Sequence, residues 1–510
     1  MTAPIVHAWR LLGWGRTLAR HGALLGIERD PLAPAPLRRI VRLLRVGARV
    51  PARPRYADAF ETLGPAAVKF GQALATRPDL VGEDAALDLT RLQDALPPVP
   101  WPQMRAAIEQ GLGRPIGDLF ASIEETPVGA ASIAQVHRAV TTDGRQVAIK
   151  VLRPGVEEVF ARALETYEWA AAQADAMGGD LARLRPRLVI ATFRQWTLRE
   201  LDLRREAASA SELAEGMRAI PDFAIPAIDW PRTARRVMTL EWLDGIKLSN
   251  RPALIAAGHD PRALAQVLVR GFLRQAIADG FFHADLHQGN LFALNDGRLA
   301  AIDFGIMGRI DRRARLWLAE IIHGLITGNY ARVAEIHFEA GYVPPHHNLA
   351  EFATALRAAG EPIRGLPVKE MSIGQMLDSL FAITRDFDMP VQPHLLLLQK
   401  TMVMVEGVAN GLDPDINMWE TAEPFVREWL RSELGPEAYL ADRLRADLAT
   451  IARLPDLVRR IEARYPAPGG APPLPPLPPV AVVRIGGGWR YAAVAIAAGL
   501  AGIAATLLLA

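Results

Sequence analysis

The chain has 510 residues, of which 50% are hydrophobic, and its formal net charge is only +2. This length suits one large domain or two ordinary ones, and the balanced charge gives no general argument for nucleic-acid binding. The sequence contains no cysteine, which excludes disulfides, thiolate catalysis, Cys-ligated zinc and iron–sulfur clusters.

The N-terminal segment, residues 1–55, is strongly basic. It contains eleven arginines against two acidic residues, Glu28 and Asp30, with leucines and Trp14 interleaved. Arginines interrupt its apolar stretches, so it lacks the continuous apolar region of a signal peptide. Two interpretations fit: a basic amphipathic helix that binds a membrane surface, or an ordinary helix packed on the domain.

Residues 126–152 have the pattern of strands around a loop of small residues. The expected order is a strand at Thr126–Val128, the loop, a strand at Ile133–Val140, a turn at Asp143-Gly144 and a strand at Gln146–Leu152. The loop consists of Gly129, Ala130, Ala131 and Ser132. Small side chains let a backbone approach phosphate groups closely, and a comparable loop covers the nucleotide phosphates in kinases.

The last of these strands contains Val-Ala-Ile-Lys, the kinase signature of the lysine that pairs with the α- and β-phosphates. We therefore expect Lys150 to contact ATP. Further along, an apolar run from Val237 leads into Glu241 and ends at Gly245. This run fits the hinge between two kinase lobes, with Glu241 near the adenine, and it fits an ordinary buried strand equally well.

A second group of motifs follows an apolar segment, Ala263–Ile277, that we expect to be helical. Asp285 and Asn290 are five residues apart, the spacing of the kinase catalytic loop, where the aspartate lies near the nucleophile and the asparagine binds metal. An expected hairpin then leads into Asp303, Phe304 and Gly305, and this aspartate is expected to hold Mg²⁺. Asn290 and Asp303 supply the oxygen ligands that Mg²⁺ prefers.

Several features depart from an ordinary protein kinase. Ala284 occupies the place of the arginine that normally pairs with a phosphorylated activation loop. Only Ile306–Asp311 separate Gly305 from a helical pattern at Arg312–Ile326, so the platform for a peptide substrate is missing. The phosphate loop also lacks the usual Gly-x-Gly-x-x-Gly sequence.

The C-terminal part reads as helices followed by a spacer and a membrane span. Residues 330–440 are expected to be helical, with Leu395–Leu398 and Met402–Val405 in the core. A proline-rich spacer at Tyr465–Pro479 precedes Tyr491–Ala510, which carries no charge. Twenty helical residues span about 30 Å, the thickness of the hydrocarbon core. A transmembrane helix is thus predicted, the alternative being a buried core helix, and the flanking arginines put the main body on the cytoplasmic side.

Several motifs together resemble the UbiB family of atypical kinase-like ATPases of ubiquinone biosynthesis. They are Lys-Phe-Gly-Gln at residues 69–72, the small-residue loop with its following strand, Glu-Leu-Asp at residues 200–202 with Glu206, and the sequence at residues 283–290. The resemblance covers residues from about 10 to 430 and the membrane tail. One difference is Gly129, where the family has alanine. Glycine makes the backbone of the loop more flexible at this position.

The resemblance implies a role for further residues. Lys69 and Gln72 belong to a helical extension that folds over the active site and blocks protein substrates. Glu200 and Asp202 form an acidic motif that meets this extension, and Glu206 pairs with Lys150. Family members often end in two membrane helices, whereas only one is expected here.

The sequence thus predicts an α+β, two-lobed protein-kinase-like fold with a helical N-terminal extension and one C-terminal transmembrane helix. The expected divisions are the basic segment 1–55, the extension 56–124, the N-lobe 125–245, the C-lobe 246–445, a helix and linker at 446–490, and the membrane helix 491–510.

The expected function is a kinase or ATPase of the inner (cytoplasmic) membrane that uses ATP and Mg²⁺ in ubiquinone biosynthesis. Its expected partners are anionic membrane lipids, polyprenyl-phenol or quinone intermediates and other quinone-biosynthesis enzymes, with no nucleic acid. The alternatives are a small-molecule or lipid kinase and a nucleotide-gated scaffold. Direct hydroxylation of the quinone is disfavoured, because the chain has neither a dinucleotide fingerprint nor a cysteine ligand for haem.

Overall fold

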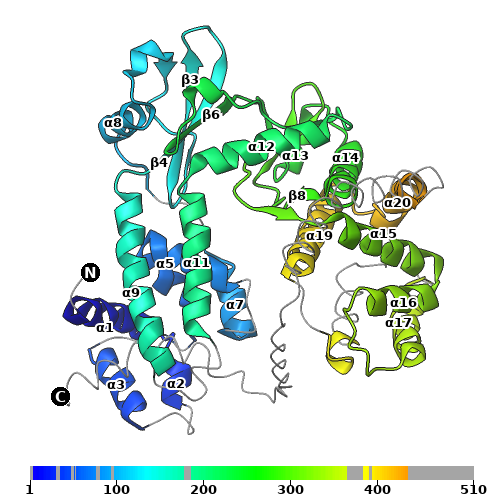
Figure 1. The fold of residues 1–510 in the computed structure, drawn as a ribbon. Helices are drawn as coiled ribbons and strands as arrows, with labels where there is room; N and C mark the ends of the chain where they lie inside the picture. The colour runs from blue at the N-terminus through cyan, green and yellow to red at the C-terminus, as the bar shows by residue number, and fades with distance from the viewer. Residues whose placement is uncertain are drawn as a thin grey trace, which may run out of the picture. The chain divides into compact units, whose positions relative to one another are not determined.

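A computed structural model of the chain describes residues 4–29, 35–47, 51, 53–75, 81–92, 97–176, 185–364, 383–389 and 393–434. It divides into two compact units (Figure 1). Unit 1 holds the described residues up to Ala207 and the segment Ile228–Trp242, and unit 2 holds Ala208–Ala227 and the described residues from Leu243 onward. Both units combine sheets and helices, which confirms the α+β class. The predicted domain limits stay predictions.

Unit 1 is built on a five-stranded antiparallel sheet with the order β1-β3-β4-β6 and with β2 paired to β3. The strands are β1 (Phe120–Ile123), β2 (Gly129–Ala130), β3 (Ala134–Thr141), β4 (Gln146–Leu152) and β6 (Val237–Glu241). The turn before β4 contains Gly144, whose φ of +86° favours glycine. The predicted hairpin and the bounds of its return strand are confirmed.

The expected strand at Thr126–Val128 is wrong, because the short strand begins after it. Gly129 and Ala130 pair with Val136 and Gln135 to form β2. The remaining loop is a tight turn in which the Ala131 N–H donates to the Ala134 carbonyl over 2.8 Å. Two of the four residues expected in the loop therefore belong to the sheet.

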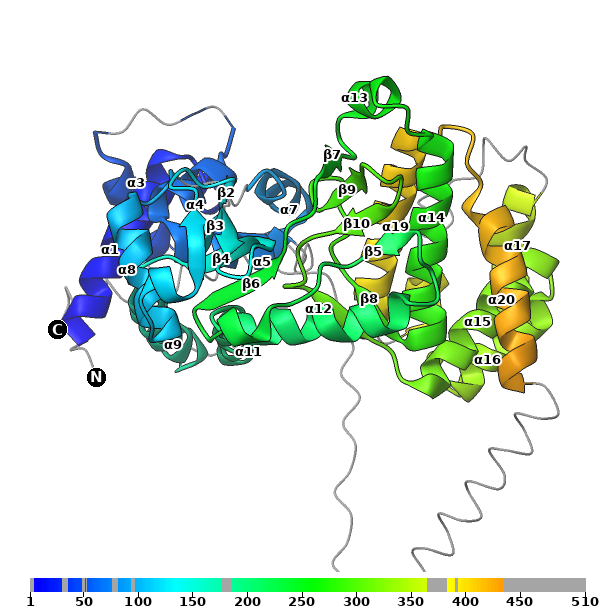
Figure 2. The same ribbon diagram turned by 90° about the horizontal axis from the view of Figure 1, so that it is seen from above.

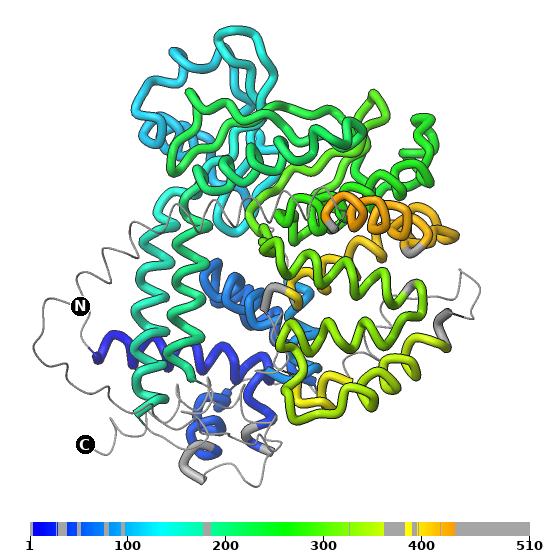
Figure 3. The backbone as a smooth tube through the Cα atoms, turned by 45° about the vertical axis from the view of Figure 1, so that its right-hand side comes forward, coloured from blue at the N-terminus to red at the C-terminus, as the bar shows by residue number. Residues whose placement is uncertain are grey.

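The helices of unit 1 form most of its N-terminal part. They are α1 (Pro4–Arg20), α2 (Leu25–Arg29), α3 (Ala35–Arg45), α4 (Tyr56–Leu63), α5 (Pro65–Ala75), α7 (Glu83–Leu89), α8 (Trp101–Leu112), α9 (Val156–Ala176), α11 (Pro186–Glu200) and α12 (Leu203–Met217), whose first turn lies in unit 1. Helices α9 and α11 lie side by side (Figure 3).

Helix α1 packs on unit 1. Its Leu11 and Leu18 join an apolar cluster with Val41 of α3 and Ala59 of α4. The interpretation of residues 1–55 as a helix packed on the domain therefore holds for α1. Membrane binding by this segment stays a prediction, and α1 leaves Trp9 71% exposed on its outer side.

Alternate residues of β4 enter two different apolar clusters. The odd-numbered residues from Val147 to Val151 join a cluster with α8. Ala148 and Leu152 join a second cluster with α9 and with the start of α12. Because side chains alternate between the faces of a strand, Lys150 lies on the second face, toward α12.

Unit 2 contains a four-stranded sheet with the order β5-β10-β9-β7 and a two-stranded sheet of β8 and β11. The strands are β5 (Phe223–Ala224), β7 (Gly245–Lys247), β8 (Phe281–His283), β9 (Leu291–Leu294), β10 (Leu299–Ala301) and β11 (Met307–Arg309). The predicted hairpin before Asp303 is confirmed as β9 and β10, which pair antiparallel.

Helices α14 and α19 pack against these sheets, and the other helices of unit 2 pack mainly on one another; Figure 2 shows the four-stranded sheet beside α14. These helices are α13 (Arg251–Ala256), α14 (Pro261–Leu273), α15 (Arg312–Thr327), α16 (Tyr330–Glu339), α17 (Leu349–Arg364), α19 (Pro393–Leu412) and α20 (Met418–Leu434). The expected helix at residues 263–277 is α14 continued by a π-helical turn, Arg274–Asp279.

The core predicted on α19 is right only in part. Leu398 and Val405 are buried, whereas Val403 is 41% exposed. A helix buries a stripe at spacings of three and four residues, so four consecutive apolar residues cannot all face the core.

No helix within the described ranges is long and apolar enough to cross a membrane. The predicted transmembrane helix at 491–510 and the linker at 446–490 lie outside the described residues. They stay predictions.

Candidate functional site

In unit 1, an ion pair joins the sheet to helix α12. The Nζ atom of Lys150 lies 2.6 Å from Oε1 of Glu206, and the side chains are only 15% and 9% exposed. Glu206 stands in the first turn of α12, where its negative charge also interacts favourably with the helix dipole. The strand register and the start of α12 thus bring these two predicted residues together.

The tip of the β2–β3 hairpin is anchored by an arginine that sequence reasoning missed. The Nε of Arg153 donates to the Ala131 carbonyl over 2.8 Å, and its Nη1 donates to the Pro97 carbonyl over 3.0 Å. Ser132, beside Ala131, is buried. Hydrogen bonds from Arg153 therefore hold the backbone that is expected to face the phosphates.

The helical extension contacts the acidic motif at Glu200. Lys69 Nζ on α5 lies 3.5 Å from Glu200 Oε1 at the end of α11. The Gln72 side chain donates to the Leu92 carbonyl over 3.4 Å. Asp202 instead accepts a hydrogen bond from the Arg204 N–H at the start of α12, and its ion pair with the Arg204 guanidinium lowers the pKa of Asp202.

The expected hinge residue Glu241 ends β6 with an exposed side chain. The next residue, Trp242, donates its N–H to the Gln146 carbonyl over 3.2 Å. The Arg138 guanidinium lies over the Trp242 ring, 4.7 Å from its centroid. The chain leaving the sheet is therefore held against β3 and β4.

In unit 2, backbone hydrogen bonds hold the 283–290 loop beside the Asp303 segment. Strand β8 pairs with β11, and the Ala284 N–H continues this ladder by donating to the Ile306 carbonyl over 2.9 Å. At the other end of the loop, the Ile302 N–H donates to the Asn290 carbonyl over 3.1 Å. Asp285, Asn290 and Asp303 are therefore positioned on one backbone frame.

The buried side chain of His283 supports this loop through a hydrogen bond. The Asp285 N–H donates to its Nδ1 over 3.0 Å, so Nδ1 carries no proton in this arrangement. The His283 N–H in turn donates to Oε1 of the buried Gln275 over 3.0 Å. Burial lowers the pKa of His283, although the charges of Asp303 and Asp285 act in the opposite direction. The imidazole is therefore neutral and serves as an internal acceptor.

The two predicted metal ligands present oxygen atoms of suitable chemistry. The Asn290 amide nitrogen donates to the Asp285 carbonyl over 3.1 Å, which leaves the amide oxygen to act as a ligand. Asp303 accepts the Gly305 N–H at Oδ1 over 3.0 Å, and the buried Phe304 fixes this turn. An amide oxygen and a carboxylate are ligands that fit Mg²⁺. The Asp285 carboxylate lies 3.8 Å from His287 Nε2.

Buried polar residues that no sequence motif indicated also support the 283–290 loop. The Thr401 hydroxyl on α19 lies 3.4 Å from the Ala284 carbonyl and 2.8 Å from the Leu397 carbonyl. Gln275 lies in a π-helical turn, a feature frequent at functional sites. The only local signal for either residue is a polar side chain within an otherwise apolar helical pattern.

Comparisons with known proteins agree with these motifs. Residues 91–337 match the model of the ABC1 atypical kinase-like domain, and residues 356–417 match the UbiB helical domain. The "Probable protein kinase UbiB" of Marinobacter nauticus is 41% identical over 407 residues, 78% of this chain and 74% of the relative. The protein of the same name from Cellvibrio japonicus is 38% identical over 439 residues, 84% of this chain and 78% of the relative.

A solved structure is also similar, that of the Rv3197–erythromycin complex from Mycobacterium tuberculosis. It has 27% sequence identity and a TM-score of 0.50, covering 71% of this chain and 92% of the solved one. This likeness and the domain match support the kinase-like fold, and the identities to the bacterial relatives confirm the predicted family. The chain belongs to the UbiB family of atypical kinase-like proteins.

Proposed function

We propose that the chain is a membrane-anchored atypical kinase or ATPase that binds MgATP and supports ubiquinone biosynthesis. The observation that carries this proposal is the buried ion pair of Lys150 and Glu206. A lysine held by a glutamate in this way is the arrangement that active kinases use to orient the α- and β-phosphates. The family to which the chain belongs supports the same reading.

Each residue of the site has a distinct part in the proposed chemistry. Lys150 balances phosphate charge, and Glu206 keeps its ammonium group in place. Asn290 and Asp303 hold Mg²⁺, which when bound neutralises charge on the β- and γ-phosphates. Asp285 accepts the hydrogen bond of the attacking hydroxyl or water and so orients its oxygen. Little further chemistry is needed, because phosphoryl transfer depends mainly on positioning and electrostatics.

The acceptor is proposed to be water or a small, lipid-like molecule. Between Asp303 and α15, which begins at Arg312, there is room only for β11 and its turns. Such a segment is too short for the long activation loop and peptide platform of a protein kinase. Ala284, in place of the usual arginine, removes the partner of a phosphorylated loop. Both features argue against a protein substrate, and we propose that ATP hydrolysis is coupled to the handling of polyprenyl-phenol intermediates.

The extension is proposed to regulate the site through the start of α12. Lys69 pairs with Glu200, only six residues before Glu206, and Asp202 between them caps α12. A movement of α5 would therefore displace the helix that holds the glutamate partner of Lys150. This provides a physical route by which Lys69, Gln72, Glu200 and Asp202 influence nucleotide binding.

The remaining proposals concern the membrane. Residues 491–510 are proposed to anchor the chain in the inner membrane with the kinase-like part on the cytoplasmic side. Anionic lipids, quinone intermediates and other quinone-biosynthesis enzymes are the proposed partners. A kinase of a small or lipid molecule is the second candidate, favoured by the same short segment after Asp303.

The test is ADP release by the purified full chain with and without anionic liposomes and a phenolic quinone-precursor mimic. We expect stimulation by membrane and phenol together, and its loss in Asp303→Asn. Nucleotide binding without ADP release under any condition would overturn the ATPase and favour a scaffold. Transfer of the γ-phosphate to the phenol would identify a kinase instead.

A further inference from the structure

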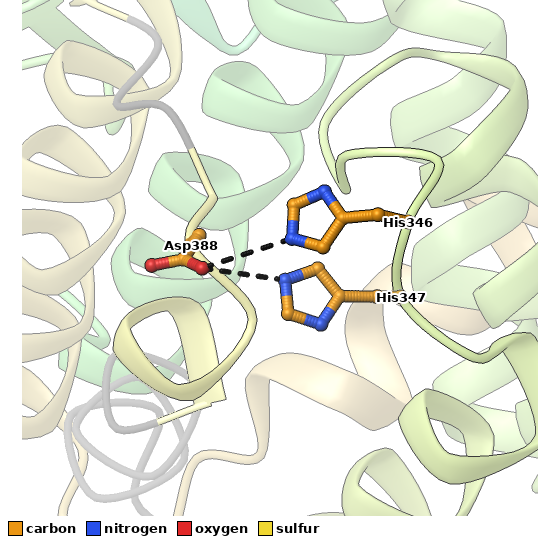
Figure 4. Close-up of side chains that lie close together, drawn as sticks. All are labelled: His346, His347 and Asp388. Carbon is orange, nitrogen blue, oxygen red and sulfur yellow. Dashed lines mark ion pairs between the residues drawn. The ribbon is translucent and has the colours of Figure 1, made fainter. Parts of the chain in front are cut away.

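Far along the chain from the kinase motifs, two histidines and an aspartate of unit 2 face one another. His346 and His347 lie between α16 and α17, and Asp388 follows the short helical segment 383–386 (Figure 4). The Asp388 Oδ2 atom lies 3.9 Å from His346 Nε2 and 3.5 Å from His347 Nε2. One donor atom from each of the three residues falls within 4.8 Å of the others.

These separations are close to those of a metal's ligand shell. Zinc binds imidazole nitrogen and carboxylate oxygen at about 2.0–2.1 Å, so two ligands of a tetrahedral ion are about 3.4 Å apart. The observed 3.5 Å and 3.9 Å need only a small inward movement of the side chains. Among the described residues, this is the one group of histidines and acidic residues whose possible metal-ligand atoms lie this close together.

The second observation is that packing, rather than the ion pairs alone, holds the three residues together. The ring of His347 lies 5.2 Å from the ring of Phe387, and that ring lies 4.9 Å from Phe352 in the core of α16 and α17. Asp388 has a left-handed φ of 48°, and the next residue closes the turn by donating to the Thr384 carbonyl over 2.9 Å. The backbone therefore directs the carboxylate before any ion binds.

The Nε2 atom of His347 is buried and makes no hydrogen bond among the described residues, although Asp388 Oδ2 lies 3.5 Å away. The His347 side chain as a whole is 18% exposed. A buried polar atom that makes no hydrogen bond is unfavourable, and a metal ion bound by both atoms would replace the missing hydrogen bond. The side chains of His346 and Asp388 are 66% and 75% exposed, so water can fill the remaining coordination positions.

We propose that His346, His347 and Asp388 bind one divalent transition-metal ion, best matched by Zn²⁺. Imidazole with one carboxylate suits zinc, copper or nickel, whereas Mg²⁺ and Ca²⁺ prefer oxygen ligands alone. The ion joins residues 383–389 to the turn between α16 and α17. The bound ion therefore acts as a clip, that is, a cross-link between these two segments of unit 2. Because the site is exposed to solvent, the ion can exchange.

The test is zinc binding by the full chain, prepared without a histidine tag and stripped with chelator. Calorimetry is performed in excess Mg²⁺, which keeps Zn²⁺ from the expected nucleotide site. We expect one Zn²⁺ per chain, with affinity reduced at least tenfold in His347→Ala and in Asp388→Asn. His259→Ala, a histidine of unit 2 outside the cluster, and Asp303→Asn should both bind zinc like the unmodified chain. Equal binding by all variants, or no binding, would overturn the site.

Hydrogen exchange tests the clip separately. Zn²⁺ should slow exchange in residues 383–389 and 344–352 of the unmodified chain, but not in Asp388→Asn, whose circular dichroism should be unchanged. Stoichiometric zinc binding without such protection would reject the clip and leave only the binding site. Cobalt substitution adds a spectroscopic check, because a tetrahedral Co²⁺ site absorbs strongly in the visible range.

Discussion

The two groups of kinase motifs are held in place by different means. In unit 1, a buried ion pair between side chains, that of Lys150 with Glu206, helps to position the lysine. In unit 2, backbone hydrogen bonds from Ala284 and Ile302 fix the segments that carry Asp285, Asn290 and Asp303. A site held by side chains should lose structure and function together when it is mutated. A site held by backbone should lose its chemistry and keep its fold.

The largest effect on stability is expected at Lys150. Lys150→Ala removes the ammonium group that lies 2.6 Å from the buried Glu206 carboxylate, and removing one partner of a buried ion pair costs about 3–5 kcal/mol of unfolding free energy. Denaturant unfolding measures it. The double variant Lys150→Met/Glu206→Leu should recover much of this loss, since no charge then stays buried. Lys247→Ala, an exposed lysine, is the control and should have little effect.

Asp303→Asn should separate chemistry from stability in unit 2. The turn around Gly305 and the Ile302–Asn290 hydrogen bond can both form with asparagine at this position, so the free energy of unfolding should fall less than in Lys150→Ala. ADP release should fall about 100-fold or more, because a ligand of the phosphate-bound metal is weakened. Comparable losses of stability in Asp303→Asn and Lys150→Ala would contradict the difference between the two units.

Acid should destabilise both units through buried neutral histidines. Burial lowers the pKa of His137 in unit 1 and of His283 and His337 in unit 2. The unfolded chain therefore binds more protons than the folded one below about pH 6.5, and stability falls as the pH drops through this range toward the folded-state values. Denaturation midpoints at pH 7.5 and 5.5 test this, and a rise in stability on acidification would contradict it.

The Lys69–Glu200 pair should affect regulation more than stability. Both side chains are partly accessible, so breaking the pair should cost about 1 kcal/mol or less. Nucleotide affinity should change in Lys69→Ala and Glu200→Gln alike, and the double variant should add little further. Additive effects in this double-mutant cycle would mean that the two residues act independently of each other.

Gly129→Ala should have the smallest effect. A Cβ atom at this position meets no atom within 4 Å, and its φ lies outside the left-handed region. Reduced freedom of the unfolded chain should raise stability by about 0.4–1 kcal/mol. Competition binding of ATP and ADP would then reveal whether the added stiffness changes nucleotide preference. A clear loss of stability would show that the hairpin needs glycine here.

Local sequence patterns predict the elements whose determinants are local. Alternating apolar residues and the glycine turn predicted the bounds of Gln146–Leu152, and the turn residues after Leu294 predicted the hairpin before Asp303. The catalytic role of the 283–290 loop stays a prediction. The prediction of a strand at Thr126–Val128 was wrong because the pairing with Val136 begins at Gly129. The family resemblance, rather than any local pattern, indicated the pairing of Lys150 with Glu206.

The residues that sequence reasoning missed act over long separations. Arg153 supports the Ala131 carbonyl, 22 residues away in the chain, and Thr401 approaches the Ala284 carbonyl, 117 residues away. Asp388 meets His346 only because the core around Phe352 and Phe387 brings the segments together. No periodicity or short motif encodes such contacts, since each depends on the completed fold.

The contact of Thr401 with the 283–290 loop joins two segments of the chain that match different family models. Thr401 lies in the segment that matches the UbiB helical domain, and Ala284 lies in the segment that matches the kinase-like domain. Helix α19 also packs along α14 beneath the loop. The two matched segments therefore share one interior in this chain, and removal of α19 would expose the side of the 283–290 loop that carries the Ala284 carbonyl.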